Sequence, residues 1–234
     1  MRECVMINNL VIIGISETAE HLASFVESYN LFNIIGYAVD RQYKTKEEFL
    51  GKPVFAIEDL PSIIDKEKDF LFVSLLWNHL NADRRKMYER LKGEGYRFAN
   101  VISPTAIVRG KLNGDNIWID DNVHIGAYSV VESDCLIKIG SLLGHHTHLG
   151  AHCFMGVKSL VAGACTIGEQ TFIGINATIF GKLNIGKKCI VGACTAVKRD
   201  MPDCSVWKTS SDFVIKTYEE SIIEEKLVSS KINH

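Results

Sequence analysis

Residues 161–179 have the sequence VAGACTIGEQTFIGINATI, in which an aliphatic side chain returns at every sixth position. The same period extends over residues 119–197, where every sixth residue is aliphatic or methionine. The series consists of Ile119, Ile125, Val131, Ile137, Leu143, Leu149, Met155, Val161, Ile167, Ile173, Ile179, Ile185, Val191 and Val197. An internal repeat of fixed length takes precedence over local signals, so we predict that this region is built from one repeated unit.

Two further columns accompany the aliphatic series. Glycine often follows the aliphatic residue, and we expect it where a backbone corner bends without a Cβ in the way. A small residue usually stands four places after the aliphatic one, as at Ser129, Cys135, Ser141, Thr147, Cys153, Ser159, Cys165, Thr171, Ala177, Cys189 and Thr195. Three such strands form one triangular coil, so the aliphatic and the small side chains would stack inward as columns along a left-handed parallel β-helix.

The cysteines fit this arrangement better than a disulfide framework. There are seven of them, an odd number, and no two form a CxxC pair. Four of them fall in the column of small residues, which favours a role as interior packing over a role as reactive thiols. We therefore expect reduced thiols and a cytoplasmic protein.

Residues 9–102 follow a different pattern, in which short apolar runs alternate with segments of helical period. The run Leu10–Gly14 predicts a buried strand, and the following helix, which Ser16 can cap, has its apolar stripe at Leu22, Phe25, Val26 and Tyr29. Further strands are expected at 34–39, 70–76 and 96–102, with a helix at 83–92. Strands separated by helices imply parallel βαβ units.

The chain is thus predicted to contain three parts. An α/β Rossmann-like domain covers residues 1–102, the β-helix covers residues 103–202, and a C-terminal extension covers residues 203–234. Apolar residues at Ile222, Ile223 and Leu227 predict a short helix over 218–227 in that extension.

Composition excludes several classes of partner. The formal net charge is −2, which provides no basic field for nucleic acid or an anionic membrane surface. No apolar run approaches the roughly 18 to 20 residues of a membrane-spanning helix, and the N-terminal run is too short for a signal-peptide core.

The sequence resembles the hexapeptide-repeat acyltransferases, specifically sugar acetyltransferases of the sialic-acid O-acetyltransferase and bacillosamine N-acetyltransferase kind. The resemblance covers nearly all of the chain up to about residue 200. It rests on the segments GYAVD (36–40), GKPV (51–54), IEDL (57–60), ISPTA (102–106), GHH (144–146) and IGEQTFIGINAT (167–178).

This resemblance implies transfer of an acetyl group from acetyl-CoA to a hydroxyl or amino group of a sugar, usually nucleotide-linked, with CoA in the groove between subunits of a homotrimer. The family's catalytic base is a histidine in the third place of a hexad, which corresponds here to His145. Imidazole exchanges protons near neutral pH, as a general base must. A solvated surface histidine is the alternative interpretation.

The resemblance also assigns residues to the cofactor. A glycine one coil after the base corresponds to Gly163, whose N–H would stabilise the oxyanion of the thioester carbonyl. The usual Gly-x-Pro-Ala-Lys closing turn is absent, but Lys198, Arg199 and Lys208 are candidates for contacts with CoA phosphates. Basic residues near a domain end are also commonly just solvated.

Three residues depart from the family pattern near the base. The acidic residue that usually follows the catalytic histidine, and orients it, is replaced by His146. A second histidine of the bacillosamine enzymes is replaced by Phe154, and a substrate-contacting asparagine corresponds to Lys138. A lysine beside the base would favour an anionic acceptor.

The loop after the first strand departs as well. Family members carry a glycine-rich phosphate loop here, whereas this chain has Gly14 and Ser16 followed by Glu17. A carboxylate at the pyrophosphate position favours an acceptor without a nucleotide, unless the side chain swings into solvent. Asp40, at the end of the second strand, is placed to contact a base or ribose, although an ordinary turn aspartate has the same position.

Two other functions compete with acetyl transfer as interpretations of the sequence. Histidines 124, 145, 146, 148 and 152 suggest a metal site like that of the γ-carbonic anhydrases, but that family's two ligands from one subunit lie five residues apart and no pair among 145, 146, 148 and 152 has that spacing, so we expect no metal. A non-catalytic scaffold that binds nucleotides or sugars and keeps the trimeric prism is the second alternative.

Overall fold

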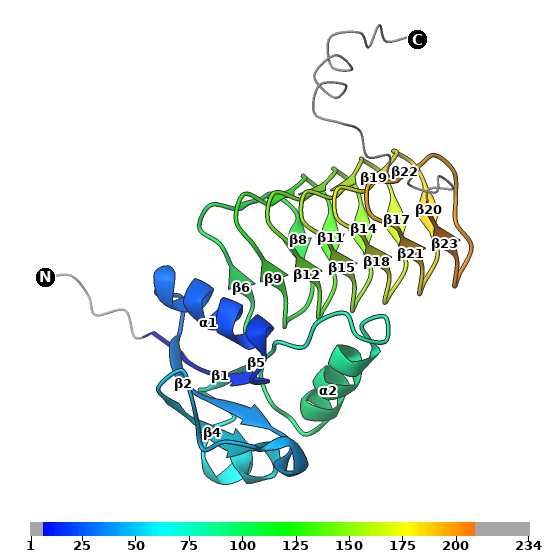
Figure 1. The fold of residues 1–234 in the computed structure, drawn as a ribbon. Helices are drawn as coiled ribbons and strands as arrows, with labels where there is room; N and C mark the ends of the chain where they lie inside the picture. Colours follow the sequence, from blue (N-terminus) through cyan, green and yellow to red (C-terminus); the bar gives the residue numbers. More distant parts are fainter. Residues whose placement is uncertain (1–6, 209–234) are drawn as a thin grey trace, which may run out of the picture.

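The computed structural model describes residues 7–208, which form an α/β domain and a triangular prism of stacked strands (Figure 1). The predicted helix at 218–227 lies outside the described residues. The elements of the α/β domain are β1 (Asn9–Ile13), α1 (Glu17–Ser28), β2 (Asn33–Val39), η1 (Arg41–Tyr43), β3 (Glu48–Phe49), β4 (Lys52–Ala56), η2 (Ile57–Ser62), β5 (Phe70–Val73) and α2 (Ala82–Gly93). The sheet order is β3-β4-β2-β1-β5, parallel except for the β3–β4 pair.

Two strand predictions in this domain need correction. The strand expected at 70–76 ends at Val73, because Ser74 turns its hydroxyl onto the carbonyl oxygen of Ile13, 2.8 Å away, and the chain leaves the sheet. The strand expected at 96–102 contains only β6 (Val101–Ile102), which pairs with a strand of the prism. Ser16 does stand at the N-cap position of α1, but its side chain makes no capping hydrogen bond.

The prism has three faces, each a parallel sheet of two-residue strands. The first face contains β6, β9 (Trp118–Ile119), β12 (Leu136–Ile137), β15 (Phe154–Met155), β18 (Phe172–Ile173), β21 (Ile190–Val191) and β23 (Val206–Trp207). The second face contains β7 (Ile107–Val108), β10 (His124–Ile125), β13 (Leu142–Leu143), β16 (Leu160–Val161), β19 (Thr178–Ile179) and β22 (Ala196–Val197). The third face contains β8 (Lys111–Leu112), β11 (Val130–Val131), β14 (His148–Leu149), β17 (Thr166–Ile167) and β20 (Asn184–Ile185).

The interior of the prism matches the predicted columns. Every aliphatic residue of the six-residue series is buried, and so is the whole column of small residues. The thiols of Cys135, Cys153, Cys165 and Cys189 lie in this core as free cysteines. The prediction that these four cysteines serve as packing residues is confirmed.

The glycines have a different role from the one predicted. The backbone bends two residues later, where the left-handed conformation is occupied mostly by other residues, such as Tyr128 at φ +61° and His146 at φ +55°. Gly144 is instead required by close approach, because a Cβ there would lie 2.5 Å from the amide nitrogen of Gly163 in the next coil. The glycine column therefore marks contact between neighbouring coils.

The α/β domain covers the first face of the prism. Trp118, Leu136 and Phe154 belong to one hydrophobic cluster with β1, β2 and α1, and Trp77 packs on Phe154 with ring centroids 5.0 Å apart. Helix α1 lies between the sheet and the prism, whereas α2 packs on the opposite face of the sheet and lies beside the prism (Figure 1). Among residues 7–208, no helix or domain covers the remaining two faces.

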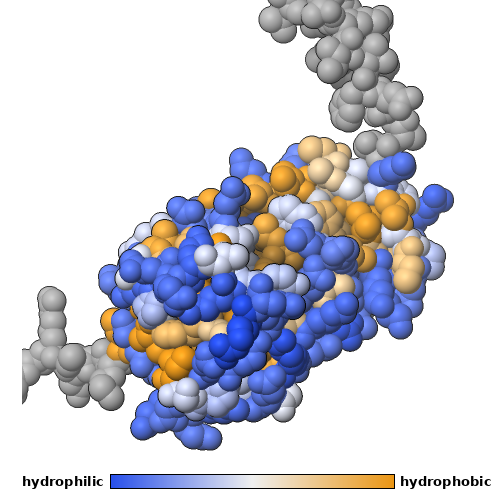
Figure 2. All heavy atoms as spheres, turned by 60° about the horizontal axis from the view of Figure 1, so that its bottom comes forward, coloured by the Kyte–Doolittle hydropathy of each residue, from blue (hydrophilic) through white to orange (hydrophobic). Residues whose placement is uncertain are grey.

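These two open faces differ in character. The outward side chains of the second face are mostly apolar or small: Ile107, His124, Leu142, Leu160, Thr178 and Ala196. Those of the third face are mostly polar: Lys111, Val130, His148, Thr166 and Asn184. In the space-filling view, hydrophobic side chains are exposed among hydrophilic ones (Figure 2).

Candidate functional site

His145 lies at the corner between the second and third faces, where its side chain is exposed. Leu143 and Thr147 on either side of it point into the prism and are buried. The hexad period thus fixes the direction of the His145 side chain, since the two flanking inward positions leave this residue on the outer surface of the corner.

The ring of His145 rests against Gly163, one coil further along. A Cβ at Gly163 would lie 2.6 Å from Nε2 and 2.7 Å from Cε1 of His145, so only glycine leaves room for this ring. Among the described residues the Gly163 N–H donates no hydrogen bond. The two residues predicted to act together are therefore neighbours in space.

His146 occupies the place of the usual acidic residue. Its Nδ1 lies 3.0 Å from Nδ1 of His145, and the two rings meet edge to face with centroids 5.2 Å apart. The ring of Tyr128 lies beside that of His146, with centroids 4.7 Å apart. If Nε2 of His145 accepts a proton from an acceptor, its Nδ1–H must donate to an unprotonated Nδ1 of His146.

Two columns run along this corner toward the end of the prism, one from His145 through Gly163 and Gly181 and the other from Gly144 through Ala162 and Phe180. The backbone bonds link His146 to Ala127, Ala164 to His145 and Lys182 to Gly163 at 3.0, 2.7 and 3.0 Å. Continuing along this corner brings Lys198 and Arg199 into the same columns as Gly144 and His145. Three coils at a strand spacing of about 4.8 Å place them roughly 14 Å from the base.

The three predicted CoA contacts are not all together. Lys198 lies over the ring of Phe180 at 5.8 Å and Arg199 over that of Trp207 at 5.2 Å. Lys208 follows β23 of the first face and lies near Gly192, at the corner between the first and second faces. Within one chain Lys208 is therefore on a different corner of the prism from Lys198 and Arg199, although Arg199 reaches the ring of the adjacent Trp207.

A groove of about 340 Å³ adjoins His145 on the side toward the start of the prism. Its lining comprises Arg109, His124, Gly126, Ala127, Leu142, Leu143, Gly144 and His145. Sequence reasoning missed Arg109, because the counted series begins at residue 119. The structural register identifies it: Ile107 pairs with His124, so the first coil is one residue short.

A larger cavity of about 740 Å³ lies at the carboxyl ends of β1 and β2 in the α/β domain. Gly14, Ser16 and Asp40 line it, as the resemblance implies. Gly14 has φ +121° and its Cβ would lie 2.8 Å from the hydroxyl oxygen of Ser74, so this position requires glycine. Glu17 is not part of this lining and borders a smaller neighbouring cavity instead.

Asp40 is engaged in an ion pair in this structure. One of its carboxylate oxygens accepts a hydrogen bond from Nη2 of Arg90 at 2.6 Å. Arg90 belongs to α2 and lines the same cavity. Asp40 is therefore held in place by α2 rather than free at the end of its strand.

The prediction that Lys138 lies beside the base is wrong for a single chain. Lys138 is at the corner between the first and second faces, its Nζ 2.6 Å from an oxygen of Asp120 and 3.4 Å from the ring centroid of Trp118. Burial lowers the pKa of this lysine, although the nearby Asp120 opposes that shift. Its charge is thus compensated at the junction with α1.

Phe154, in place of a second histidine, also faces the α/β domain. Its ring stacks on that of Phe172 with centroids 5.1 Å apart and an interplanar angle of 4°. The substitution therefore serves the contact between the domain and the prism.

Two of the remaining histidines of the cluster, His148 and His152, contact carboxylates. His148 Nε2 lies 3.1 Å from Glu132, and His152 Nδ1 lies 2.8 Å from Asp134. Over residues 7–208, no group of three or more His, Cys, Asp and Glu side chains is arranged to hold a metal ion. Within the same range, no helix has the length and apolar character needed to cross a membrane.

The two sides of α2 have separate roles. Asp83, Lys86, Met87 and Arg90, spaced i, i+3, i+4 and i+7, line the large cavity. The opposite side is anchored to the prism by Arg84, which is fully buried and donates from Nε to Asp134 at 3.1 Å. One helix therefore links the cavity to the prism.

Sequence comparison alone gives no match to a protein-family model or to any curated protein. Structural comparison does. A variant of perosamine N-acetyltransferase from Caulobacter crescentus, in complex with CoA and GDP-perosamine, is 28% identical with a TM-score of 0.75, over 85% of this chain and 92% of that one.

Two more distant structures share the fold. The acetyltransferase domain of PglB from Neisseria gonorrhoeae is 21% identical with a TM-score of 0.73, over 85% of this chain and 95% of that one. WeeI from Acinetobacter baumannii is 17% identical with a TM-score of 0.72, over 84% of this chain and 94% of that one. All three matches span both the α/β domain and the prism.

Proposed function

We propose that this protein, a hexapeptide-repeat sugar acetyltransferase in fold and in its likeness to solved structures, moves an acetyl group from acetyl-CoA to an amino group of a nucleotide-linked sugar in surface-polysaccharide biosynthesis. The observation that carries the proposal is the position of His145, with Nε2 against Gly163 and Nδ1 against His146. This geometry supports the assignment of His145 as the base and of the Gly163 N–H as the oxyanion donor.

The reaction follows from these groups. The sugar nitrogen attacks the thioester carbonyl carbon, and the Gly163 N–H stabilises the negative charge that develops on the carbonyl oxygen. His145 takes the proton from the nitrogen through Nε2. The C–S bond then breaks, and the leaving thiolate receives a proton to give free CoA.

The neutral partner of His145 favours an amine over a hydroxyl as the acceptor. A carboxylate in the position of His146 would stabilise the imidazolium more strongly than a neutral imidazole does. An unprotonated amine attacks first and needs to lose its proton only afterwards, whereas a hydroxyl needs help from the base during attack. The weaker His–His pair is thus suited to N-acetylation.

The acetyl donor is proposed to lie along the corner that carries His145. Lys198 and Arg199, about 14 Å away by coil spacing, would bind CoA phosphates while the pantetheine arm runs past Gly181 and Gly163. A perosamine N-acetyltransferase with the same fold binds CoA, which supports this assignment. No metal is needed for this chemistry.

The acceptor nucleotide is proposed to occupy the large cavity of the α/β domain. The first turn of α1 begins at this cavity, and its free N–H groups suit a phosphate. Gly14 and Ser16 would approach one phosphate of the nucleotide, and Asp40 would contact the base or ribose. Because Glu17 borders the neighbouring cavity, we retain a nucleotide-linked acceptor.

The active unit is proposed to be a homotrimer in the cytoplasm, where acetyl-CoA is made and the thiols stay reduced. The apolar second face is the natural surface for identical copies. If three second faces surround a threefold axis, the His145 corner of one subunit meets the Lys138 corner of the next. Lys208 then comes opposite Lys198 and Arg199 across the groove.

The test is a transfer assay with a panel of acceptors. Protein, acetyl-CoA and a thiol-detecting reagent are mixed with GDP-, UDP- and dTDP-linked amino sugars and with the matching hydroxy sugars. Release of CoA that depends on an amino sugar supports the proposal. Tight binding of sugar and CoA with no CoA release would instead identify a scaffold.

A further inference from the structure

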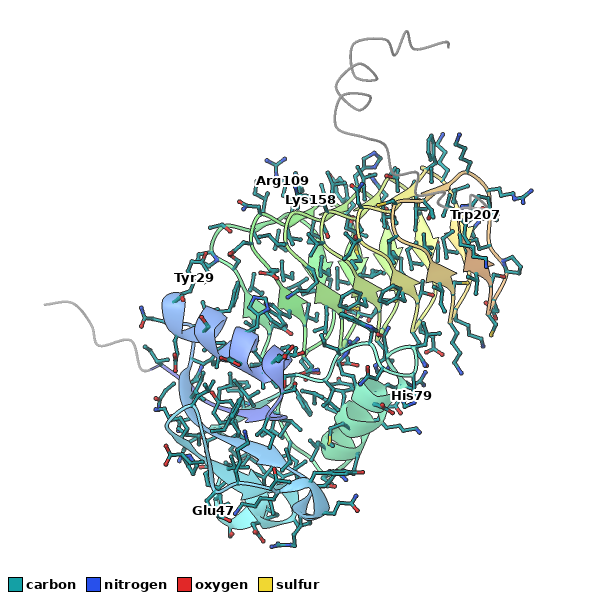
Figure 3. All side chains as sticks on the ribbon, in the orientation of Figure 1. Tyr29, Glu47, His79, Arg109, Lys158 and Trp207 are labelled. Carbon is teal, nitrogen blue, oxygen red and sulfur yellow. The ribbon has the colours of Figure 1, made fainter. Side chains whose placement is uncertain are left out.

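The groove beside His145 contains one positive charge that the proposed reaction has not used. Arg109 lines this groove together with His124 and His145. It lies on the first coil, at the opposite end of the corner from Lys198 and Arg199. In Figure 3 its side chain projects from the prism on the side remote from the α/β domain.

Only small residues lie between Arg109 and the base along this corner. Arg109 N–H donates to the carbonyl of Ile125 at 2.9 Å, so the next residue in its column is Gly126, followed by Gly144. A Cβ at Gly126 would lie 2.5 Å from the amide nitrogen of His145. The groove between Arg109 and His145 is therefore lined by glycine backbone and the small side chain of Ala127.

The guanidinium of Arg109 forms no ion pair and no hydrogen bond within residues 7–208. By contrast, Arg84, Arg85 and Arg90 are each paired with a carboxylate. A pocket with mostly apolar walls and a few polar groups is typical of a small-molecule site. The free charge in such a groove is available to a ligand.

We propose that Arg109 binds an oxyanion of the acceptor, either a carboxylate on the sugar or a phosphate of its nucleotide, and thereby selects anionic acceptors. The inference rests on the proposed acetyl transfer and specifies its substrate class. The planar guanidinium presents two parallel N–H donors, which match a carboxylate or a phosphate. The CoA phosphates are assigned to cations at the far end of the corner.

The experiment compares Arg109→Gln and Arg109→Lys with the native protein in steady-state transfer assays. Lys111→Gln is the matched control, since Lys111 is an exposed cation on the same coil but on the third face. We expect Arg109→Gln to raise the acceptor KM about 10- to 100-fold, as loss of a charge-assisted hydrogen bond implies. The KM for acetyl-CoA should stay unchanged, Arg109→Lys should recover part of the affinity, and Lys111→Gln should behave as native protein.

Two acceptor series distinguish the source of the oxyanion. If the phosphate is bound, the effect of Arg109→Gln appears with nucleotide-linked amino sugars and disappears with free amino sugars. If a carboxylate is bound, it appears only with amino sugars that carry a carboxyl group.

Two outcomes would overturn the inference. One is an unchanged acceptor KM in Arg109→Gln for every acceptor that the native protein acetylates. The other is dissociation of the oligomer in Arg109→Gln, which would assign the arginine to a contact between subunits. Failure of the native protein to acetylate any sugar is a different result, which contradicts the proposed function itself.

Discussion

Nε2 of His145 lies so close to the backbone of Gly163 that a methyl group there would come within 2.6 Å of it. The contact joins two coils of the prism and fixes the position of the His145 ring relative to Gly163. Gly163→Ala should therefore push the ring of His145 away and lower kcat about 10- to 100-fold, because small misplacements at a reacting centre are costly. Gly93→Ala, where a Cβ meets nothing within 4 Å, is the control. Native kcat in Gly163→Ala would show that this contact is irrelevant to catalysis.

His145 itself is expected to be the general base. His145→Asn should lower kcat by about 10²- to 10⁴-fold while CoA binding and unfolding temperature remain native. His148→Asn removes an exposed histidine from the adjacent face and should leave kcat unchanged. Full activity of His145→Asn would mean that solvent or another group accepts the proton.

Substitutions of His146 test what the imidazole beside His145 contributes to catalysis. His146→Asp places a carboxylate beside His145, and aspartate tolerates the left-handed backbone at this position better than most residues. A carboxylate stabilises the imidazolium form of His145. As the solution is acidified, the variant should therefore lose activity at a higher pH than the native protein, so the acid limb of its pH profile shifts to higher pH. His146→Asn, with similar shape and no charge, should not show this shift. An identical acid limb in both variants would contradict the pairing of the two rings.

Arg84 and Asp134 should dominate the attachment of the α/β domain. Both side chains are fully buried, and Asp134 also contacts Asn116 and His152. Asp134→Asn leaves Arg84 without its charge partner and should cost about 3–5 kcal/mol of unfolding free energy. Arg85→Gln breaks a partly exposed pair and should cost about 1 kcal/mol or less. Equal losses in the two variants, measured by denaturant unfolding, would contradict this ranking.

The second face should mediate assembly. Leu160→Glu introduces a charge on its apolar surface and should convert the oligomer to monomers in sedimentation velocity runs. Thr166→Glu makes a comparable change on the polar third face and should leave the oligomer intact. A native protein that sediments as a monomer at micromolar concentration would reject the trimer and the shared groove.

The prism could be predicted from sequence because its interior repeats in strict register. The inward positions alternate between an aliphatic residue, such as Leu143, and a small one, such as Thr147, and this six-residue period in the sequence reports the period of the structure. The resemblance to the acetyltransferases assigned the base to His145, and the register then gave Gly163 one coil away. This part of the candidate site needed the resemblance as well as the six-residue period.

Other features depended on contacts between distant segments. Lys138 was expected beside the base, but its neighbours Asp120 and Trp118 and the covering helix α1 come together only through the fold. The ion pair between Asp40 and Arg90 joins a strand end to a helix 50 residues later. Arg109 escaped notice because its coil is one residue short and falls outside the counted series. No local pattern carries such information.

The central claim is acetyl transfer to a sugar amine, and the most direct measurement is product analysis by mass spectrometry. Native protein and His145→Asn are incubated with acetyl-CoA and nucleotide-linked amino sugars. We predict an N-acetylated sugar and an equal amount of free CoA with the native protein, formed at least about 100-fold more slowly by His145→Asn. Native protein that binds acetyl-CoA and a nucleotide-linked amino sugar yet yields no acetylated product would contradict the account.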